Sequence, residues 1–155
     1  MDGAVNLGHS DRRAAGDWIR RGLEKAEFSF RLQGAVLFGS CTKGHAGEES
    51  DLDLLVVGIG IAPQRQRRSR EILQIARIFP GAPLDILLMT PEEVGSNFRN
   101  HHPLFLNIAE DGIILLDTGG SLAAALEETR RYIGDRGIER LQDGWRYPAA
   151  RGAAT

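Results

Sequence analysis

Residues 36–57 read VLFGSCTKGHAGEESDLDLLVV, and this stretch decides the fold. A hydrophobic strand ends at Gly39 and Ser40, and after ten intervening residues a second strand opens with Asp51 and Asp53, one leucine apart. Because side chains alternate across a pleated strand, the two aspartates share one face while the leucines beside them enter a core. Adjacent carboxylates repel each other and are costly to desolvate without a cation between them. The pair therefore predicts a divalent metal site.

Length and composition favour one globular domain. The chain has 155 residues, of which 42% are hydrophobic and 26% charged, and its net charge is -2. The near-neutral charge gives no general attraction to nucleic acid, so bulk DNA binding is not expected. We expect a single domain over 1–155, with a core at about 11–133 and a C-terminal extension, 134–155, that could be partly disordered.

The sequence also bears on cellular location. Cys41 is the single cysteine and cannot form an internal disulfide, and the N-terminal MDGAVNLGHSDRR lacks the apolar core of a signal peptide. The longest apolar run, 54–63, is far shorter than the roughly 20 residues that span a bilayer. We therefore expect a cytoplasmic protein with no membrane anchor.

Hydrophobic periodicity predicts strands that alternate with helices. Strands are expected at 35–38, after a break at Gly34, and at 51–57, 84–89 and 113–116. Helices are expected at 11–30, from Pro63 to 79, from Pro91 onward and at 121–133, and a short one at 138–145. This order predicts an α/β (α+β) fold with a mixed β-sheet flanked by helices.

Three local signals fix helix ends. Thr90 and Glu93 form a capping box with proline at the first helical position. Pro103 interrupts the next helical stretch and predicts a kink or two short helices ending at Gly112. Ser121 is the expected N-cap of the last long helix.

A third carboxylate completes the candidate site. Asp85 lies early in the strand at 84–89 between apolar neighbours, which predicts burial and hence a need for a partner. If the strands of Gly39 and Asp53 run antiparallel, the end of one lies beside the start of the other. Three carboxylates in one cleft can hold two Mg²⁺ ions roughly 3.5 to 4 Å apart, as in two-metal phosphoryl transfer.

The sequence resembles the signature of the DNA polymerase beta-type nucleotidyltransferase superfamily. The resemblance rests on the GS pair, the DLDLLVV segment that follows it after ten residues, and the later LDILLMT segment. The closest likeness is to the superfamily's minimal nucleotidyltransferases, small cytoplasmic proteins of which many are antitoxins in HEPN/MNT toxin-antitoxin pairs. The resemblance covers about residues 34–117. It implies a polymerase beta-like fold and transfer of a nucleoside monophosphate from a triphosphate, with pyrophosphate leaving.

The resemblance also implies a role for each residue that matches. Gly39 and Ser40 would grip the nucleotide phosphates, Asp51 and Asp53 would bind both metal ions, and Asp85 would bind the catalytic ion and assist deprotonation of the acceptor. The cofactors implied are two Mg²⁺ ions and a nucleoside triphosphate, with ATP favoured.

The loop after the GS pair departs from the usual pattern. Many minimal members carry arginine where this chain has Cys41 and Lys43. Lys43 can still contact phosphate as a point charge, but it lacks the bidentate fork of arginine.

Other conspicuous residues have simpler interpretations. The arginines of 65–70 are interpreted as a solvated helix face in preference to a site for RNA or an acidic partner. His101 and His102 are adjacent and do not face each other on a helix, which favours a loop or cap role over a metal site. Trp18 and Trp145 are expected to be packing residues.

The leading hypothesis is a magnesium-dependent nucleotidyltransferase that transfers AMP to a hydroxyl of a protein or RNA, with a HEPN-type toxin as partner. One alternative is a small-molecule enzyme that modifies an antibiotic. About 38 residues follow Asp117, fewer than the added helical domain of such relatives, which ranks this alternative lower. The other alternative is a binding module that neutralises its partner by contact alone.

Overall fold

Four strands form one mixed sheet in the computed structural model, which describes residues 12–39 and 52–148. In their order across the sheet, the strands are β3 (Leu84–Met89), β2 (Leu52–Ile59), β1 (Arg31–Phe38) and β4 (Ile113–Asp117). β1 is antiparallel to both of its neighbours, whereas β2 and β3 are parallel. The mixed sheet and its flanking helices confirm the predicted fold class.

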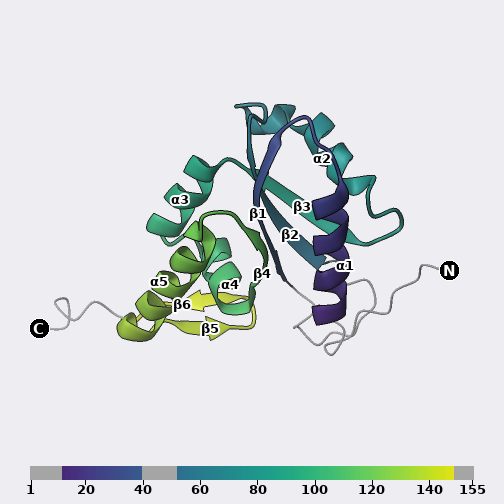
Figure 1. Cartoon of the computed structure of the whole chain (residues 1–155). Coiled ribbons are helices and arrows are strands. Elements are labelled where there is room, and N and C mark those ends of the chain that lie inside the picture. The colour runs from purple at the N-terminus through teal and green to yellow at the C-terminus, as the bar shows by residue number, and fades with distance from the viewer. Residues whose placement is uncertain (1–11, 40–51, 149–155) are drawn as a thin grey trace, which may run out of the picture.

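Helices cover both faces of this sheet (Figure 1). They are α1 (Arg12–Lys25), α2 (Ser69–Ala76), α3 (Pro91–Arg99), α4 (Pro103–Asp111) and α5 (Ser121–Arg136), with a short turn of 3-10 helix, η3 (Arg65–Arg67), before α2. Leu54 and Val56 of β2 pack on the α1 and α2 side, and the alternate residues Leu55 and Val57 pack against α3, α4 and α5. The period of two along β2 thus divides the core into two layers.

Gly34 lies within the first strand, whereas the sequence expectation placed it before a strand that starts at residue 35. It pairs with Val57 on one side and Asp117 on the other. A Cβ atom at Gly34 would lie 2.6 Å from Cδ1 of Leu122, a buried residue of α5. Glycine is therefore present because α5 packs closely on the strand at this point.

Two of the predicted helix ends are confirmed. The hydroxyl of Thr90 accepts a hydrogen bond from the backbone N–H of Glu93 (3.1 Å), and the Glu93 carboxylate accepts one from the N–H of Thr90 (2.9 Å). Pro103 separates two short helices, α3 and α4. The ring of His102 caps α4 by accepting a hydrogen bond from the N–H of Leu104 (3.2 Å).

Two helix boundaries differ from those expected. The first helix ends at Lys25 and not near Phe30, and the rings of Phe28 and Phe30 stack 4.8 Å apart in the segment that leads into β1. Ser121 is the first residue of α5 but not its cap. The carboxylate of Asp117 instead accepts hydrogen bonds from the backbone N–H groups of Leu122 (3.0 Å) and Ala123 (2.8 Å). A side chain from the preceding strand therefore caps the helix, which a local signal at Ser121 could not indicate.

The expected helix at 138–145 is wrong, because this segment forms a hairpin. Its strands are β5 (Glu139–Leu141) and β6 (Gly144–Arg146). Ile138 is buried and the indole N–H of Trp145 donates to Asn107 Oδ1 of α4 (2.7 Å), whereas Leu141 is 43% exposed. Ile138, Leu141 and Trp145 therefore do not share one buried face, as they would on an amphipathic helix. Residues 149–155, the end of the C-terminal extension expected to be partly disordered, lie outside the described residues.

Membrane insertion has no support among the helices. In residues 12–39 and 52–148, none combines the length and the apolar character that crossing a bilayer requires.

Candidate active site

Asp53 lies where three strands meet. It is the second residue of β2, and its partners in register are Phe38 on β1 and Asp85 on β3. Because residues paired across a sheet project to the same side, the carboxylates of Asp53 and Asp85 share a face. Leu55 and Val57 follow Asp53 at intervals of two and pack with α3, α4 and α5. Both carboxylates thus belong to that face, at the end of the sheet where β1 ends.

Gly39 directly follows β1 and lies against Asp53. Its backbone has a φ of 118°, in the region that favours glycine. A Cβ atom there would lie 2.9 Å from Cγ of Asp53 and 3.0 Å from its Cβ. The motif resemblance implies that Gly39 contacts the nucleotide phosphates; the geometry adds that the neighbouring carboxylate excludes any larger residue.

The burial expected for Asp85 is wrong, because its side chain is exposed. In the described sheet β3 is an edge strand, and its buried residues, Leu88 and Met89, lie at the far end. The apolar neighbours of Asp85 in sequence therefore do not enclose it. Its carboxylate needs no buried counter-charge and is open to a ligand from solution.

The pair of Asp53 and Asp85 fits part of a site for a hard divalent cation. Neighbouring strands lie about 4.8 Å apart, so carboxylates from paired positions can both reach one ion at about 2.0 to 2.6 Å. Among the residues that the structure describes, no group of three or more His, Cys, Asp or Glu side chains gathers. The third expected ligand, Asp51, lies outside them, and so do Ser40 and Lys43. Their roles stay predictions.

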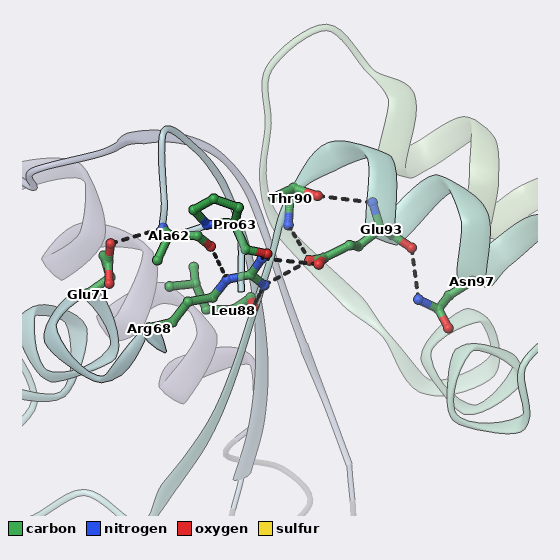
Figure 2. A network of polar contacts seen from close by, with 8 residues as sticks. All are labelled: Ala62, Pro63, Arg68, Glu71, Leu88, Thr90, Glu93 and Asn97. Carbon is green, nitrogen blue, oxygen red and sulfur yellow. Dashed lines mark hydrogen bonds and ion pairs between the residues drawn. The ribbon is translucent and has the colours of Figure 1, made fainter. Parts of the chain in front are cut away.

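A buried arginine, Arg68, organises the other end of β3 (Figure 2). Its side chain is 1% exposed, and all five guanidinium N–H donors are used. Two reach the Glu93 carboxylate at 2.8 and 3.1 Å, and three reach the backbone oxygens of Ala62 (2.7 Å), Leu88 (3.0 Å) and Pro63 (3.1 Å). The loop after β2, the end of β3 and the start of α3 are thereby joined.

Arg68 corrects two sequence interpretations. It does not belong to a solvated basic face, although Arg65, Arg67 and Arg70 around it are exposed. The helix expected from Pro63 also starts later, at Ser69, because the loop folds around this guanidinium. A signal for its burial was present, since Arg68 extends the apolar stripe of Ile72 and Ile75 at offsets of four and three.

Glu93 is the carboxylate partner in this network. The hydrogen bonds from Arg68 lower the pKa of Glu93, helped by the hydrogen bond from the backbone of Thr90 and by the charges of Arg68 and Arg65, while partial burial opposes them. Glu93 therefore caps α3 and neutralises Arg68 at once. The network lies at the opposite end of β3 from Asp85, so it supports the sheet without contributing to the site.

Comparison with known proteins identifies one matching family. The model of the nucleotidyltransferase domain matches residues 19–116. No curated protein matches the chain.

Several solved structures resemble the chain. A chain of a toxin-antitoxin complex with AMP-PNP is 16% identical and has a TM-score of 0.47, with 79% of this chain and 92% of that chain covered. A putative nucleotidyltransferase from Sulfolobus solfataricus is 19% identical, with a TM-score of 0.44 and coverage of 74% and 90%. A chain of the tri-AMPylated Shewanella oneidensis HEPN toxin in complex with MNT antitoxin is 14% identical, with a TM-score of 0.42 and coverage of 79% and 92%.

Proposed function

Since this chain belongs to the nucleotidyltransferase domain family, we propose that it is a magnesium-dependent enzyme that transfers AMP from ATP to a hydroxyl group of a protein. The observation that carries this proposal is the register of Asp53 with Asp85, with Gly39 held against Asp53. Two carboxylates on one face at the end of a buried sheet, one of them open to solvent, suit a site that binds a cation and a phosphate chain together.

Each carboxylate has a distinct role in this proposal. Asp51 and Asp53 would hold the cations that neutralise the triphosphate, and Asp85 would share the ion nearest the acceptor. Mg²⁺ bound there would supply charge neutralisation for the phosphates and a lowered pKa for the acceptor hydroxyl. Asp85 is exposed, so an acceptor can approach it and give up its proton there. The acceptor oxygen forms a bond to the α-phosphorus, the bond from that phosphorus to the bridging oxygen breaks, and pyrophosphate leaves.

The phosphates would be held at the end of β1. Gly39 has no side chain to obstruct them, and Ser40 would donate its hydroxyl and backbone N–H. Lys43 would contribute a single positive charge. Because lysine cannot bind two oxygens in a fork as arginine does, we expect the nucleotide affinity to depend strongly on the cation.

The partner that we propose is a HEPN-type protein, on the strength of the motif resemblance to minimal nucleotidyltransferases. An alternative rests on Cys41 and Lys43, which stand where many such proteins have arginine. In that alternative the chain neutralises its partner by contact alone.

The test is transfer of α-phosphate-labelled ATP to protein and RNA in a lysate of the native host, with and without Mg²⁺. We expect one labelled protein band that requires Mg²⁺ and is absent with Asp53→Asn, while the control Asp143→Asn, an exposed carboxylate on the hairpin, labels normally. Label found in RNA would show that the acceptor is an RNA and not a protein. Label that survives Asp53→Asn would refute the assignment, and absence of both label and Mg²⁺-dependent ATP binding would favour the contact-only alternative.

A further inference from the structure

A hollow lies at the edge of the sheet, between α1 and β4. Its volume is about 280 Å³. We call it the α1–β4 groove, and its lining consists of Arg13, Gly16, Asp17 and Arg20 from α1 together with Ile113, Ile114 and Leu115 from β4. Figure 1 shows α1 standing in front of the sheet, on the opposite face from α3 and α5. The groove is therefore separate from the face that carries Asp53 and Asp85.

One end of this groove lies beside the candidate active site. Nη2 of Arg12, at the start of α1, donates to the backbone oxygen of Asp111 (3.2 Å), two residues before β4 begins. On β1, Leu37 pairs with Ile113 of β4, and the next residue, Phe38, pairs with Asp53 of β2. Since β4, β1 and β2 are consecutive strands, Ile113 and Asp53 are about two strand spacings apart, or about 10 Å.

The groove has an apolar floor and a basic wall. Gly16 brings α1 close to β4, because a Cβ there would lie 3.1 Å from Cδ2 of Leu115. Arg13, Asp17 and Arg20 recur at offsets of four and three and form the wall. Arg13 is exposed and makes no ion pair with another described residue, whereas Arg20 pairs with both Asp17 (3.4 Å) and Glu24 (3.5 Å). The wall is nevertheless positive, because α1 carries four arginines and one lysine against these two carboxylates.

β4 offers a strand edge along the same groove. Within the described sheet it pairs on one side only, with β1. An edge strand leaves alternate backbone N–H and C=O groups without partners, and extended peptides bind such edges by adding a strand. Ile113 and Ile114 pair with consecutive residues of β1, and the shift in register comes after them, so the edge is regular at the end near Asp53.

We propose that the α1–β4 groove receives an extended, acidic segment of the acceptor protein, which adds to β4 as a strand. The side chains of the segment that face α1 are acidic and meet the basic wall, the alternate side chains are apolar and turn to the opposite face, on which Ile114 packs, and the edge of β4 supplies the backbone hydrogen bonds. That this segment belongs to the acceptor rests on the proposed function. Binding in the groove places this segment about 10 Å from Asp53. The part of the acceptor protein that follows the segment can then enter the candidate active site.

The test uses a fluorescent peptide of alternating valine and glutamate, with a valine and lysine peptide as its control, and no nucleotide. We expect the glutamate peptide to bind the full chain, to bind less tightly as salt is raised, and to slow hydrogen exchange at the amides of Ile113–Asp117. The double variant Arg13→Glu, Arg20→Glu should weaken binding by about tenfold or more. The milder double variant Arg13→Gln, Arg20→Gln should lose part of the affinity for the glutamate peptide. Arg21→Glu, a change at an exposed residue of α1 outside the groove, should alter that affinity less than twofold.

Three results would overturn the proposal. They are equal binding of the two peptides, binding that the groove variants leave unchanged, and protection confined to amides outside β4.

Binding that appears only after residues 1–11 are removed would assign the groove to the chain itself, and a dimer that Arg13→Glu dissociates would assign it to a second copy. Because no nucleotide is used, peptide binding without label transfer would refute the proposed function alone, and label transfer without peptide binding would refute the groove alone.

Discussion

A Cβ atom on Gly39 would lie 2.9 Å from Cγ of Asp53, so the carboxylate on β2 occupies the space that a side chain after β1 would need. The glycine of the GS motif is therefore required by an adjacent proposed metal ligand as well as by its own positive φ of 118°. Two motifs that are separate in the sequence form one unit at the antiparallel junction of β1 and β2.

Replacing Gly39 by alanine should impair activity more than folding. We expect Gly39→Ala to lower the free energy of unfolding by about 1 to 3 kcal/mol and to lower label transfer by about a hundredfold, because Asp53 must move. Gly60→Ala is the control, since Gly60 also has positive φ but a Cβ atom there would meet nothing within 4 Å. Urea unfolding and transfer assays separate the two effects, and equal activity losses in both variants would contradict the explanation.

Removing either described carboxylate should abolish the response to Mg²⁺. Wild type should be stabilised by about 2.7 kcal/mol at a hundredfold excess of Mg²⁺ over its Kd, and EDTA should reverse the stabilisation. Asp53→Asn and Asp85→Asn should show little of it and should transfer label at least about a hundredfold more slowly. Thermal unfolding with and without Mg²⁺ measures the first effect. Asp143→Asn serves as the control, and a full Mg²⁺ response in Asp53→Asn would exclude that residue as a ligand.

The Arg68–Glu93 pair should make stability depend on acid pH. The pKa of Glu93 is lowered in the folded protein, mainly by the hydrogen bonds from Arg68. Its contribution is therefore complete above the unfolded pKa of about 4.3 and is lost as the pH falls through the lower, folded pKa. Glu93→Gln should flatten this acid limb in urea unfolding measured between about pH 7 and about pH 3. Glu92→Gln, an exposed neighbour on α3, should leave it unchanged.

Loss of the buried guanidinium should be more damaging than loss of an exposed one. Arg68→Ala leaves the Glu93 carboxylate and three backbone oxygens without their donor. We expect it to cost about 3 to 5 kcal/mol of unfolding free energy, whereas Arg67→Ala should cost less than about 0.5 kcal/mol. Denaturant titration at neutral pH compares the two, and similar losses would argue against the network.

The start of α5 distinguishes a tertiary cap from a local one. Asp117→Ala should cost about 0.5 to 2 kcal/mol, because its carboxylate accepts from two backbone N–H groups of the first turn. Ser121→Ala should have almost no effect, although the sequence alone favours serine as the cap. The comparison uses thermal unfolding of the two variants, and a larger loss for Ser121→Ala would restore the local interpretation.

Local signals predicted those features whose causes are local. The capping box of Thr90 and Glu93, the strand at 84–89 and the division of the helical region at Pro103 depend on neighbours within a few residues, and the structure contains all three. The hairpin at 139–146 was missed because Trp145 is fixed by Asn107 of α4, far away in the sequence. The sequence expectations were wrong for residues whose contacts lie on another helix or strand.

The sequence by itself determined the family and the alternation that directs the carboxylate of Asp53 to one face of its strand, because a period of two is a property of any strand. Only the tertiary structure decided that Asp85 is exposed, that Gly39 lies against Asp53, and that Arg68 is buried among five acceptors. Each of these depends on which strand lies at the edge, which strands run antiparallel, and how a loop closes over the end of the sheet. These are long-range choices, set by the packing of the whole core, and no short window of sequence contains them.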